Sequence, residues 1–271
     1  MKQTDRMEVI NVSDVGRRRP HNEDSTLSDP GQGLAILADG MGGYKAGEVA
    51  SAIAVTTIHH EVTQGLKRIR RGQTDKGTGL TLESILVREA VVRANNGIYN
   101  TAQREPHCQG MGTTVVVTFL HDDILTVAHV GDSRLYRKRA EDFSQVTRDH
   151  SLIQELIDRG LYTPEEAAKT TPKNLVTRAL GIEAEVRVDV VEERVLPGDV
   201  YLLCSDGLND MVDDEEIRLT LSKYSANLVV AADEMVRLAN SKGGKDNISI
   251  ILIRIREGNS RKGGLLARFF R

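Results

Sequence analysis

The chain has 271 residues, of which 39% are hydrophobic and 28% charged, and 36 Lys and Arg against 39 Asp and Glu leave a net charge of −3. This size and composition allow a sizeable buried core, and the lack of a basic excess and of Trp argues against nucleic-acid binding. No apolar run approaches the ~20 residues that span a bilayer and no secretory signal is present, so we expect a cytoplasmic protein without an integral membrane segment.

The first half of the chain alternates short strands with two long helices. Strands are predicted at 7–12 and at 34–38, where the apolar run LAILA stops at Asp39 and Gly40. Apolar residues at three- and four-residue spacing predict helices over 46–64 and 81–103. The runs TTVVVTFL (113–120) and ILTVAHV (124–130), joined by a polar turn at 121–123, predict an antiparallel hairpin.

The second half begins with a polar stretch that reaches Gly181, with short helices at 151–159 and 164–169, which we interpret as a surface flap. Strands follow at 186–195, 200–204 and 248–255, with a helix at 226–241. Hairpin-connected strands and separately grouped helices predict an α+β fold with antiparallel sheets. We expect one domain over residues 1–255, a flexible basic tail over 256–271, and a monomer.

The two cysteines exclude one class of phosphatase. A cysteine-dependent phosphatase needs an Arg six residues after its thiolate to close the phosphate-binding loop. Thr114 follows Cys108 at that spacing and Asp210 follows Cys204. Both cysteines are therefore expected to be reduced and structural.

Five aspartates stand where an apolar strand meets Gly or Asn, namely Asp24, Asp39, Asp132, Asp206 and Asp246. Each alone is more simply a turn residue, but several such sites can converge on one hole. Converging carboxylates are costly unless cations lie between them, and oxygen ligands select hard ions such as Mg²⁺ or Mn²⁺. Two such ions can activate a water for phosphate-ester hydrolysis without a protein nucleophile.

A series of eight motifs makes the interpretation specific. In order they are GRRRPHNED (16–24), ADGMGG (38–43), GMGTT (110–114), HVGDSRLY (129–136), DHS (149–151), TRALG (177–181), LLCSDGL (202–208) and KDNIS (245–249). This series resembles that of the metal-dependent protein phosphatases, the protein phosphatase 2C-like enzymes, in their bacterial form, over residues 8–255. The resemblance implies a four-layer α/β/β/α sandwich of two antiparallel sheets flanked by helices.

The resemblance also implies an activity and a metal site. The activity is hydrolysis of phosphoserine and phosphothreonine on proteins, which reverses the action of serine/threonine kinases, with phosphorylated proteins and such a kinase as partners. Asp39 would bridge two core Mn²⁺ or Mg²⁺ ions, the Gly40 carbonyl would join one of them, and Asp206 with Asp246 would hold the other. Asp132 resembles the residue that recruits a third, weaker ion in bacterial members.

Three further roles follow from the same resemblance. Glu23 and Asp24 would act through metal-bound waters, in keeping with the few direct carboxylates that hydrated Mg²⁺-like ions require. Arg19 aligns with the phosphate-binding arginine, and a guanidinium offers a phosphoryl group two parallel donors.

The general acid is left open by the sequence. Animal members carry a His directly after the bridging Asp-Gly, whereas this chain has Met41 there. A metal-bound water or His21 could instead protonate the leaving group.

Two rival functions remain. One is a binding module that has lost its metals, which is disfavoured because Arg19 and the metal aspartates are present. The other is a hydrolase of small phosphate esters.

Overall fold

The computed structural model describes residues 6–42, 46–170, 172 and 175–257. The strands are β1 (Met7–Asp14), β2 (Asp24–Asp29), β3 (Leu34–Met41), β4 (Gly112–Thr113), β5 (Val115–His121), β6 (Ile124–Val130), β7 (Arg134–Arg139), β8 (Asp142–Gln145), β9 (Asp189–Arg194), β10 (Val200–Cys204) and β11 (Ile248–Ile255). The helices are α1 (Ala46–Gly65), α2 (Leu82–Arg104), the 3-10 turn η2 (Pro106–Cys108), α3 (Leu152–Asp158), α4 (Pro164–Thr170), α5 (Asp206–Asn209), α6 (Asp214–Lys223) and α7 (Leu228–Ser241).

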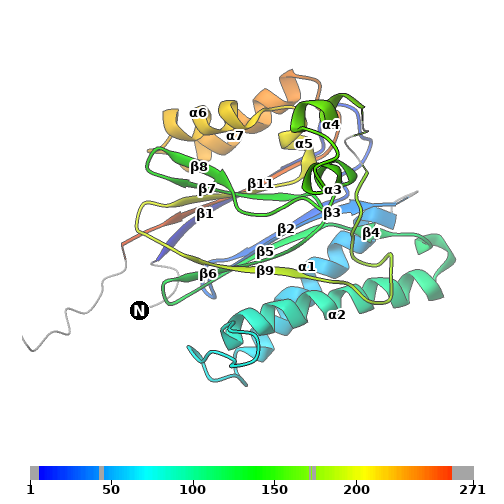
Figure 1. The fold of residues 1–271 in the computed structure, drawn as a ribbon, viewed down its shortest axis with the longest axis vertical. Helices are drawn as coiled ribbons and strands as arrows, with labels where there is room; N and C mark the ends of the chain where they lie inside the picture. The colour runs from blue at the N-terminus through cyan, green and yellow to red at the C-terminus, as the bar shows by residue number, and fades with distance from the viewer. Residues whose placement is uncertain (1–5, 43–45, 171, 173–174, 258–271) are drawn as a thin grey trace, which may run out of the picture.

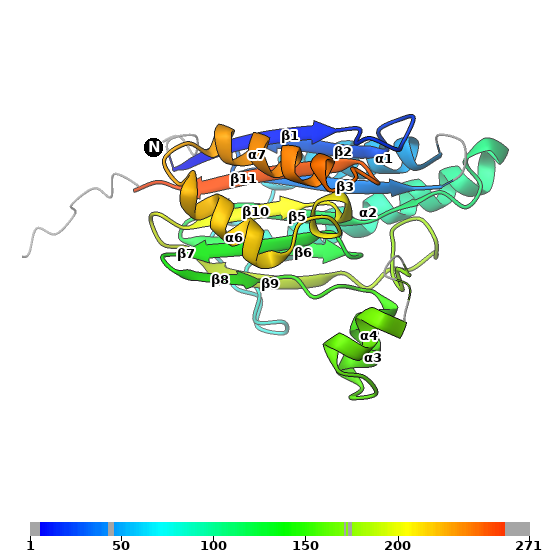
Figure 2. The ribbon, with the colours of Figure 1, turned by 90° about the horizontal axis from the view of Figure 1, so that it is seen from above.

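The strands form two antiparallel sheets. One has the order β1-β11-β10-β7-β8 and the other β2-β3-β5-β6-β9, with β4 paired to β3. The sheets lie against each other, α6 and α7 cover the first, and α1 and α2 cover the second (Figures 1 and 2). The predicted α/β/β/α sandwich is confirmed.

Burial on both faces explains why several strands are continuous apolar runs. Along β11, Ile248, Ile250 and Leu252 pack toward α6 and α7, whereas the alternate residues Ile251 and Ile253 lie between the two sheets. The same two-residue alternation divides β3 between the helix side and the sheet side. Each sheet therefore has apolar contacts on both faces, which fixes its strand register.

Strands β2, β7 and β8, the 3-10 turn η2 and helices α5 and α6 were not predicted, and β4 was not distinguished from β5. Strands β2 (DSTLSD) and β7 (RLYRKR) are polar, and β7 buries only Leu135 and Tyr136 completely. Pairing with apolar neighbours places such segments in a sheet despite their composition. Helix α6 begins with a capping box between Asp213 and Glu216, which is a signal readable in the sequence.

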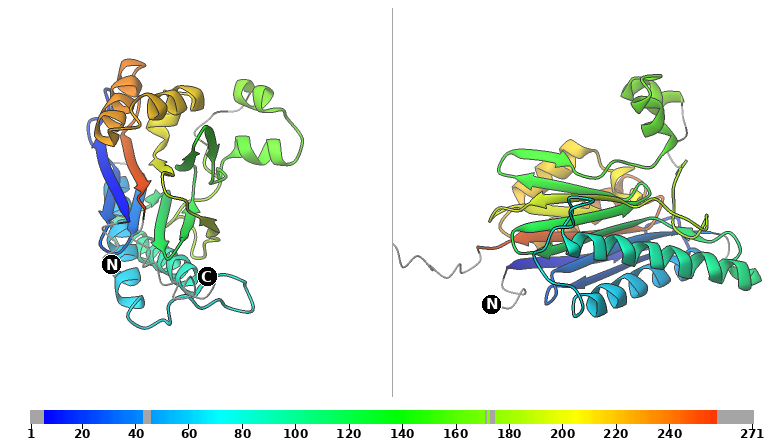
Figure 3. Two further views of the ribbon diagram at one scale, coloured as in Figure 1. Left: turned by 90° about the vertical axis from the view of Figure 1, so that its left-hand side faces the viewer. Right: turned by 60° about the horizontal axis from the view of Figure 1, so that its bottom comes forward.

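The flap prediction is confirmed in position: α3 and α4 stand away from the sandwich (Figure 3). An isolated bridge between Ser151 and Val176 closes the base of this region.

The strand predicted at 186–195 was too long, since β9 begins only at Asp189 and a loop precedes it. Within the described residues no helix is long and apolar enough to cross a membrane. Residues 258–271, most of the predicted tail, lie outside the described residues.

Candidate active site

Chain direction in the first sheet brings two of the predicted ligands together. Strand β10 ends at Cys204, two residues before Asp206, and Asp246 lies two residues before β11 begins. The two strands are antiparallel, with Cys204 opposite Ile250. The end of one and the start of the other therefore meet at the same sheet edge.

The second sheet contributes the other carboxylates at this edge. Asp39 lies directly across from Asp24 in the β2–β3 pair, and Asp132 follows the end of β6. The expectation that all five aspartates stand at strand ends was wrong in part. Strand β3 continues past Asp39, since Gly40 and Met41 pair with β4, while Asp24 begins β2.

These residues surround one cavity of about 250 Å³. Seven of the eight predicted site residues line it, and the eighth, Asp24, is the β2 residue paired with Asp39. The full lining is Arg19, Glu23, Asp39, Gly40, Met41, Gly42, Thr114, Asp132, Val176, Asp206 and Asp246. Loops of both sheets and the base of the flap thus enclose an acidic hollow.

The carboxylates repel one another strongly. Burial, followed by repulsion from Asp24 and Asp206, raises the pKa of Asp39 well above its ordinary value. Burial and then the charge of Asp132 raise the pKa of Asp206 to about 8. Burial is also the main cause that raises the pKa of Asp132 and of Asp24 to about 6. Such a cluster is unfavourable as a set of anions and calls for bound cations.

The donors present fit hard divalent ions. Oδ1 of Asp24 and Oδ1 of Asp206 are buried and have no hydrogen-bond partner within the described chain. Unpaired carboxylate oxygens at this depth are costly unless another group, such as a cation, satisfies them. Apart from the Arg19 nitrogens and the Met41 sulfur, every polar side-chain atom in the cavity wall that could bind a metal is an oxygen. A set of oxygen ligands fits Mg²⁺ or Mn²⁺ rather than zinc.

Arg19 lies at the mouth of the cavity with its side chain 49% exposed. Its Nη2 donates to Oδ2 of Asp246 at 2.7 Å, and this hydrogen bond is the main cause that raises its pKa. The guanidinium is therefore held beside the cavity by one of the proposed metal ligands. Its half-exposed position leaves donors available to an entering anion.

Several polar residues that the sequence analysis did not single out hold the site together. Asn247 accepts from the Glu23 amide at 2.8 Å and donates to the carbonyls of Val15 and His21 at 2.9 Å, which ties the β1–β2 loop to the Asp246 segment. Ser205 donates to Asp24 Oδ2 at 2.9 Å. The signal for both was their place inside the KDNIS and LLCSDGL motifs.

Asp39 is positioned from behind by two threonines. The hydroxyl of Thr113 donates to the Asp39 carbonyl at 2.7 Å, and the Thr114 amide donates to the same oxygen at 2.9 Å. The Asp39 amide in turn donates to the Thr114 hydroxyl at 3.3 Å. The GMGTT motif thus fixes the backbone of the aspartate predicted to bridge the metals.

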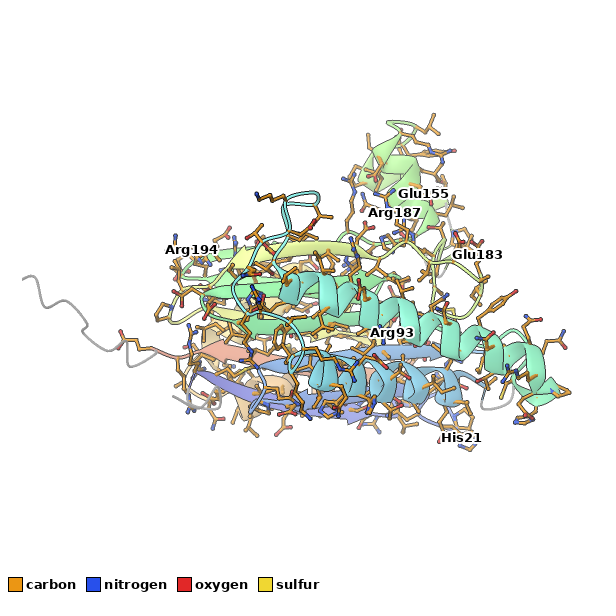
Figure 4. All side chains as sticks on the ribbon, turned by 90° about the horizontal axis from the view of Figure 1, so that it is seen from below. His21, Arg93, Glu155, Glu183, Arg187 and Arg194 are labelled. Carbon is orange, nitrogen blue, oxygen red and sulfur yellow. The ribbon has the colours of Figure 1, made fainter. Side chains whose placement is uncertain are left out.

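Met41, which stands where the resemblance would place the histidine of animal family members, lines the cavity. None of the described residues that line the cavity is a histidine, and His21 is exposed at the outer edge of the molecule (Figure 4). Its carbonyl is held by Asn247, so the backbone of His21 serves the loop. This placement gives no support to His21 as the general acid.

The cysteines were predicted to be reduced and structural, and the structure shows no disulfide between them. Cys108 and Cys204 are both free and buried. Burial raises the pKa of the Cys204 thiol to about 12, so it carries no reactive thiolate near neutral pH.

Comparison with known proteins agrees with this geometry. The family model described as Protein phosphatase 2C matches residues 17–249. The chain belongs to the protein phosphatase 2C family. It is therefore a metal-dependent protein serine/threonine phosphatase with Mn²⁺ or Mg²⁺ as cofactor, as the motif series predicted.

The relatives extend over nearly the whole chain. The protein phosphatase PhpP of Streptococcus pneumoniae is 35% identical over 255 residues, covering 93% of this chain and 98% of PhpP. The crystal structure of the serine/threonine phosphatase PstP of Mycobacterium tuberculosis superimposes with a TM-score of 0.82 at 34% identity, covering 93% of this chain and 100% of the chain in that crystal structure. A PstP catalytic-domain structure with two manganese ions gives a TM-score of 0.77 at 34% identity, covering 93% and 99%.

A histidine pair lies behind the Asp132 turn. The rings of His129 and His150 stack with centroids 4.8 Å apart, and Gly131 donates its amide to His150 Nδ1 at 3.0 Å. With Asp189 the pair offers three potential ligand atoms within 4.8 Å of one another. Arg178, which donates to Asp189 Oδ1 at 3.0 Å, already supplies a cation there, so we interpret the cluster as structural.

Acid is expected to destabilise the fold through His150. Burial lowers its pKa to about 4, whereas the unfolded chain titrates near the ordinary 6.5. The unfolded state therefore binds more protons between these values, so this contribution is fully present above about pH 6.5 and falls by about 2 kcal/mol at pH 5. Urea unfolding at pH 7.5 and pH 5 of wild type and of His150→Asn should show a smaller acid loss in the variant. An equal loss in both would contradict this role.

Proposed function

We propose that Asp39, Gly40, Asp206 and Asp246 hold two Mn²⁺ or Mg²⁺ ions in the cavity, and that Asp132 with Asp206 recruits a third, weaker ion. Glu23 and Asp24 act through waters of the metal shell. The observation that carries the proposal is the convergence of these carboxylates from both sheets, with buried oxygens of Asp24 and Asp206 left unpaired. When bound, the ions supply an activated water and stabilise charge on the phosphoryl oxygens.

The chain's own residues bind and orient the substrate. We propose that Arg19 binds the phosphoryl group at the cavity mouth through the guanidinium N–H groups that do not donate to Asp246. Thr113 and Thr114 hold the Asp39 backbone, and Asn247 holds the loop that carries Glu23, so that the ligands are preorganised. Met41 and Val176 give the entrance an apolar side. No histidine of the described cavity wall supplies the leaving-group proton, which leaves solvent as its source in this proposal.

The cellular setting is part of the proposal. Substrates would be phosphoproteins, a serine/threonine kinase among them, in the cytoplasm. Two buried free cysteines suit a reducing compartment.

We further propose that residues 1–255 form one domain that acts as a monomer. The pairing of β1 with β11, which joins Met7 to Ile255, supports the domain proposal, and sizing of the purified protein by light scattering tests the monomer.

The first experiment measures phosphate release from a phosphothreonine peptide by purified protein. Activity should be lost in a chelator, return with Mn²⁺, and be near background for Asp39→Asn and for a phosphotyrosine peptide. A folded protein that turns over neither phosphopeptides nor small esters with any metal would favour the binding module. Turnover of small phosphate esters alone would favour the small-ester hydrolase.

A further inference from the structure

A second and larger hollow adjoins the catalytic cavity. It has a volume of about 710 Å³ and shares Met41 and Val176 with the catalytic cavity. Its remaining lining comes from one stretch of chain between the flap and β9: Thr177, Arg178, Ala179, Ile182, Glu183, Glu185, Val186 and Arg187. We call this hollow the side groove. Its size lies within the range of ligand-binding clefts.

The side groove has an apolar floor. Met41, Val176, Ile182 and Val186 contribute apolar surface, and Ile182 is 50% exposed. A single exposed Ile is ordinary on a protein surface. Here it lies in a hollow that adjoins the catalytic cavity through Met41 and Val176, so a polypeptide that reaches from that cavity into the hollow would cover it.

The wall that carries Ile182 is held rigidly. Asn95 of α2 is completely buried, accepts from the Gly181 amide at 2.8 Å, and donates to the carbonyls of Glu183 and Ala184 at 3.0 and 3.2 Å. A Cβ at Gly181, where φ is +85°, would lie 2.2 Å from Ile98 Cγ2, so the loop packs directly on α2. A buried side-chain amide devoted to one loop specifies that loop's conformation. The side groove is therefore preorganised for binding.

The arginines along the side groove lie beside an acidic partner, whereas its glutamates have no ion-pair partner among the described residues. Arg178 donates to Asp189 at 3.0 Å, and Arg187 lies 3.6 Å from the same carboxylate. Glu183 and Glu185 are exposed, and no ion pair with another described residue engages either of them. Figure 4 shows Glu183 and Arg187 on the connection that leads to β9. Counted with Asp189, these two basic and three acidic groups leave a net charge of −1. The acidic groups without an ion pair to a described residue are Glu183 and Glu185, which favours a basic partner beside them.

We propose that the side groove binds the polypeptide next to the phosphorylated residue, with an apolar side chain against Ile182 and Met41 and a Lys or Arg near Glu183 and Glu185. This inference rests on the proposed function and names the substrate class of that site. The groove thereby distinguishes phosphoproteins, which reach beyond the catalytic cavity, from small esters, which do not.

The test compares three substrates in Mn²⁺: p-nitrophenyl phosphate, a phosphothreonine peptide flanked by Leu and Lys, and the same peptide with Ser and Glu at those positions. Ile182→Ala and the double variant Glu183→Lys, Glu185→Lys should each raise KM for the Leu/Lys peptide by about 3- to 10-fold. Values for p-nitrophenyl phosphate should stay within about 2-fold, because that ester fills the catalytic cavity alone. The charge-reversed variant should prefer the Ser/Glu peptide.

Matched controls separate the groove from general surface effects. Leu219→Ala removes a side chain of similar exposure, 51%, on α6, and Glu89→Lys reverses an exposed charge on α2. Both should behave as wild type on all three substrates. Unchanged peptide kinetics in the groove variants, or equal losses on the small ester, would overturn the groove proposal while leaving the phosphatase intact. A wild type that hydrolyses only the small ester would overturn the proposed function and the groove together.

Discussion

Asp206→Asn is expected to lower kcat/KM on a phosphothreonine peptide by more than about 100-fold, the loss typical of damage around a metal ligand. The same substitution is expected to raise the melting temperature of the metal-free protein by about 3 °C or more. Activity and metal-free stability thus change in opposite directions. The reason is that Asp206 is placed for a cation and not for the stability of the empty fold.

The physical basis is the crowding of like charges. Burial and the neighbouring charge of Asp132 raise the pKa of Asp206 to about 8, and its Oδ1 has no partner in the described chain. Asn has nearly the same shape but carries no carboxyl group that must either take up a proton or ionise among like charges, and it adds a donor that can reach neighbouring carboxylates. Without metal this relieves repulsion, whereas with metal it removes a ligand.

Thermal unfolding in chelator and in Mn²⁺, together with peptide kinetics, measures both effects. Wild type should gain more stability from Mn²⁺ than the variant, since ligand binding to the native state stabilises it. Asp233→Asn, at an exposed position of α7, serves as the control and should change neither quantity. Full activity in Asp206→Asn, or lower metal-free stability than wild type, would refute the assignment.

Gly207→Ala is expected to cost about 1–3 kcal/mol of stability and about 100-fold in activity. A Cβ at Gly207 would lie 2.0 Å from the Asn247 carbonyl oxygen and 2.9 Å from its carbon. Both contacts are backbone atoms, which cannot rotate away. Gly207 directly follows Asp206, and Asn247 directly follows Asp246. The methyl group would therefore push apart two proposed metal ligands.

Gly97→Ala is the matched control for this change. Gly97 lies within α2, and a Cβ there would meet Ile53 Cγ2 at 3.5 Å, an ordinary contact. This variant should be neutral or more stable by about 0.4–1 kcal/mol and fully active, since Ala restricts the unfolded chain. Urea unfolding and the Mn²⁺ dependence of peptide hydrolysis measure both variants. Equal behaviour of Gly207→Ala and Gly97→Ala would show that close approach of the two loops is not required.

The sequence by itself determined the elements with a clear apolar period and the identity of the site residues. The strands β3, β5 and β11 could be recognised as continuous apolar runs because both of their faces are buried. The helices α1, α2 and α7 could be recognised because their apolar residues recur at helical spacing. The aspartates were recognisable because each stands in a short motif beside such an element. Family resemblance then supplied the roles that composition and spacing could not.

Only the tertiary structure decided how these pieces meet. Strands β2 and β7 are polar, and they are strands because neighbouring strands satisfy their backbone groups. The position of Asp24 across from Asp39, the ties made by Asn247, and the side groove anchored by Asn95 all join residues far apart in the chain. Such contacts cannot be predicted from local sequence, because the pairing of distant segments depends on how the whole sandwich packs.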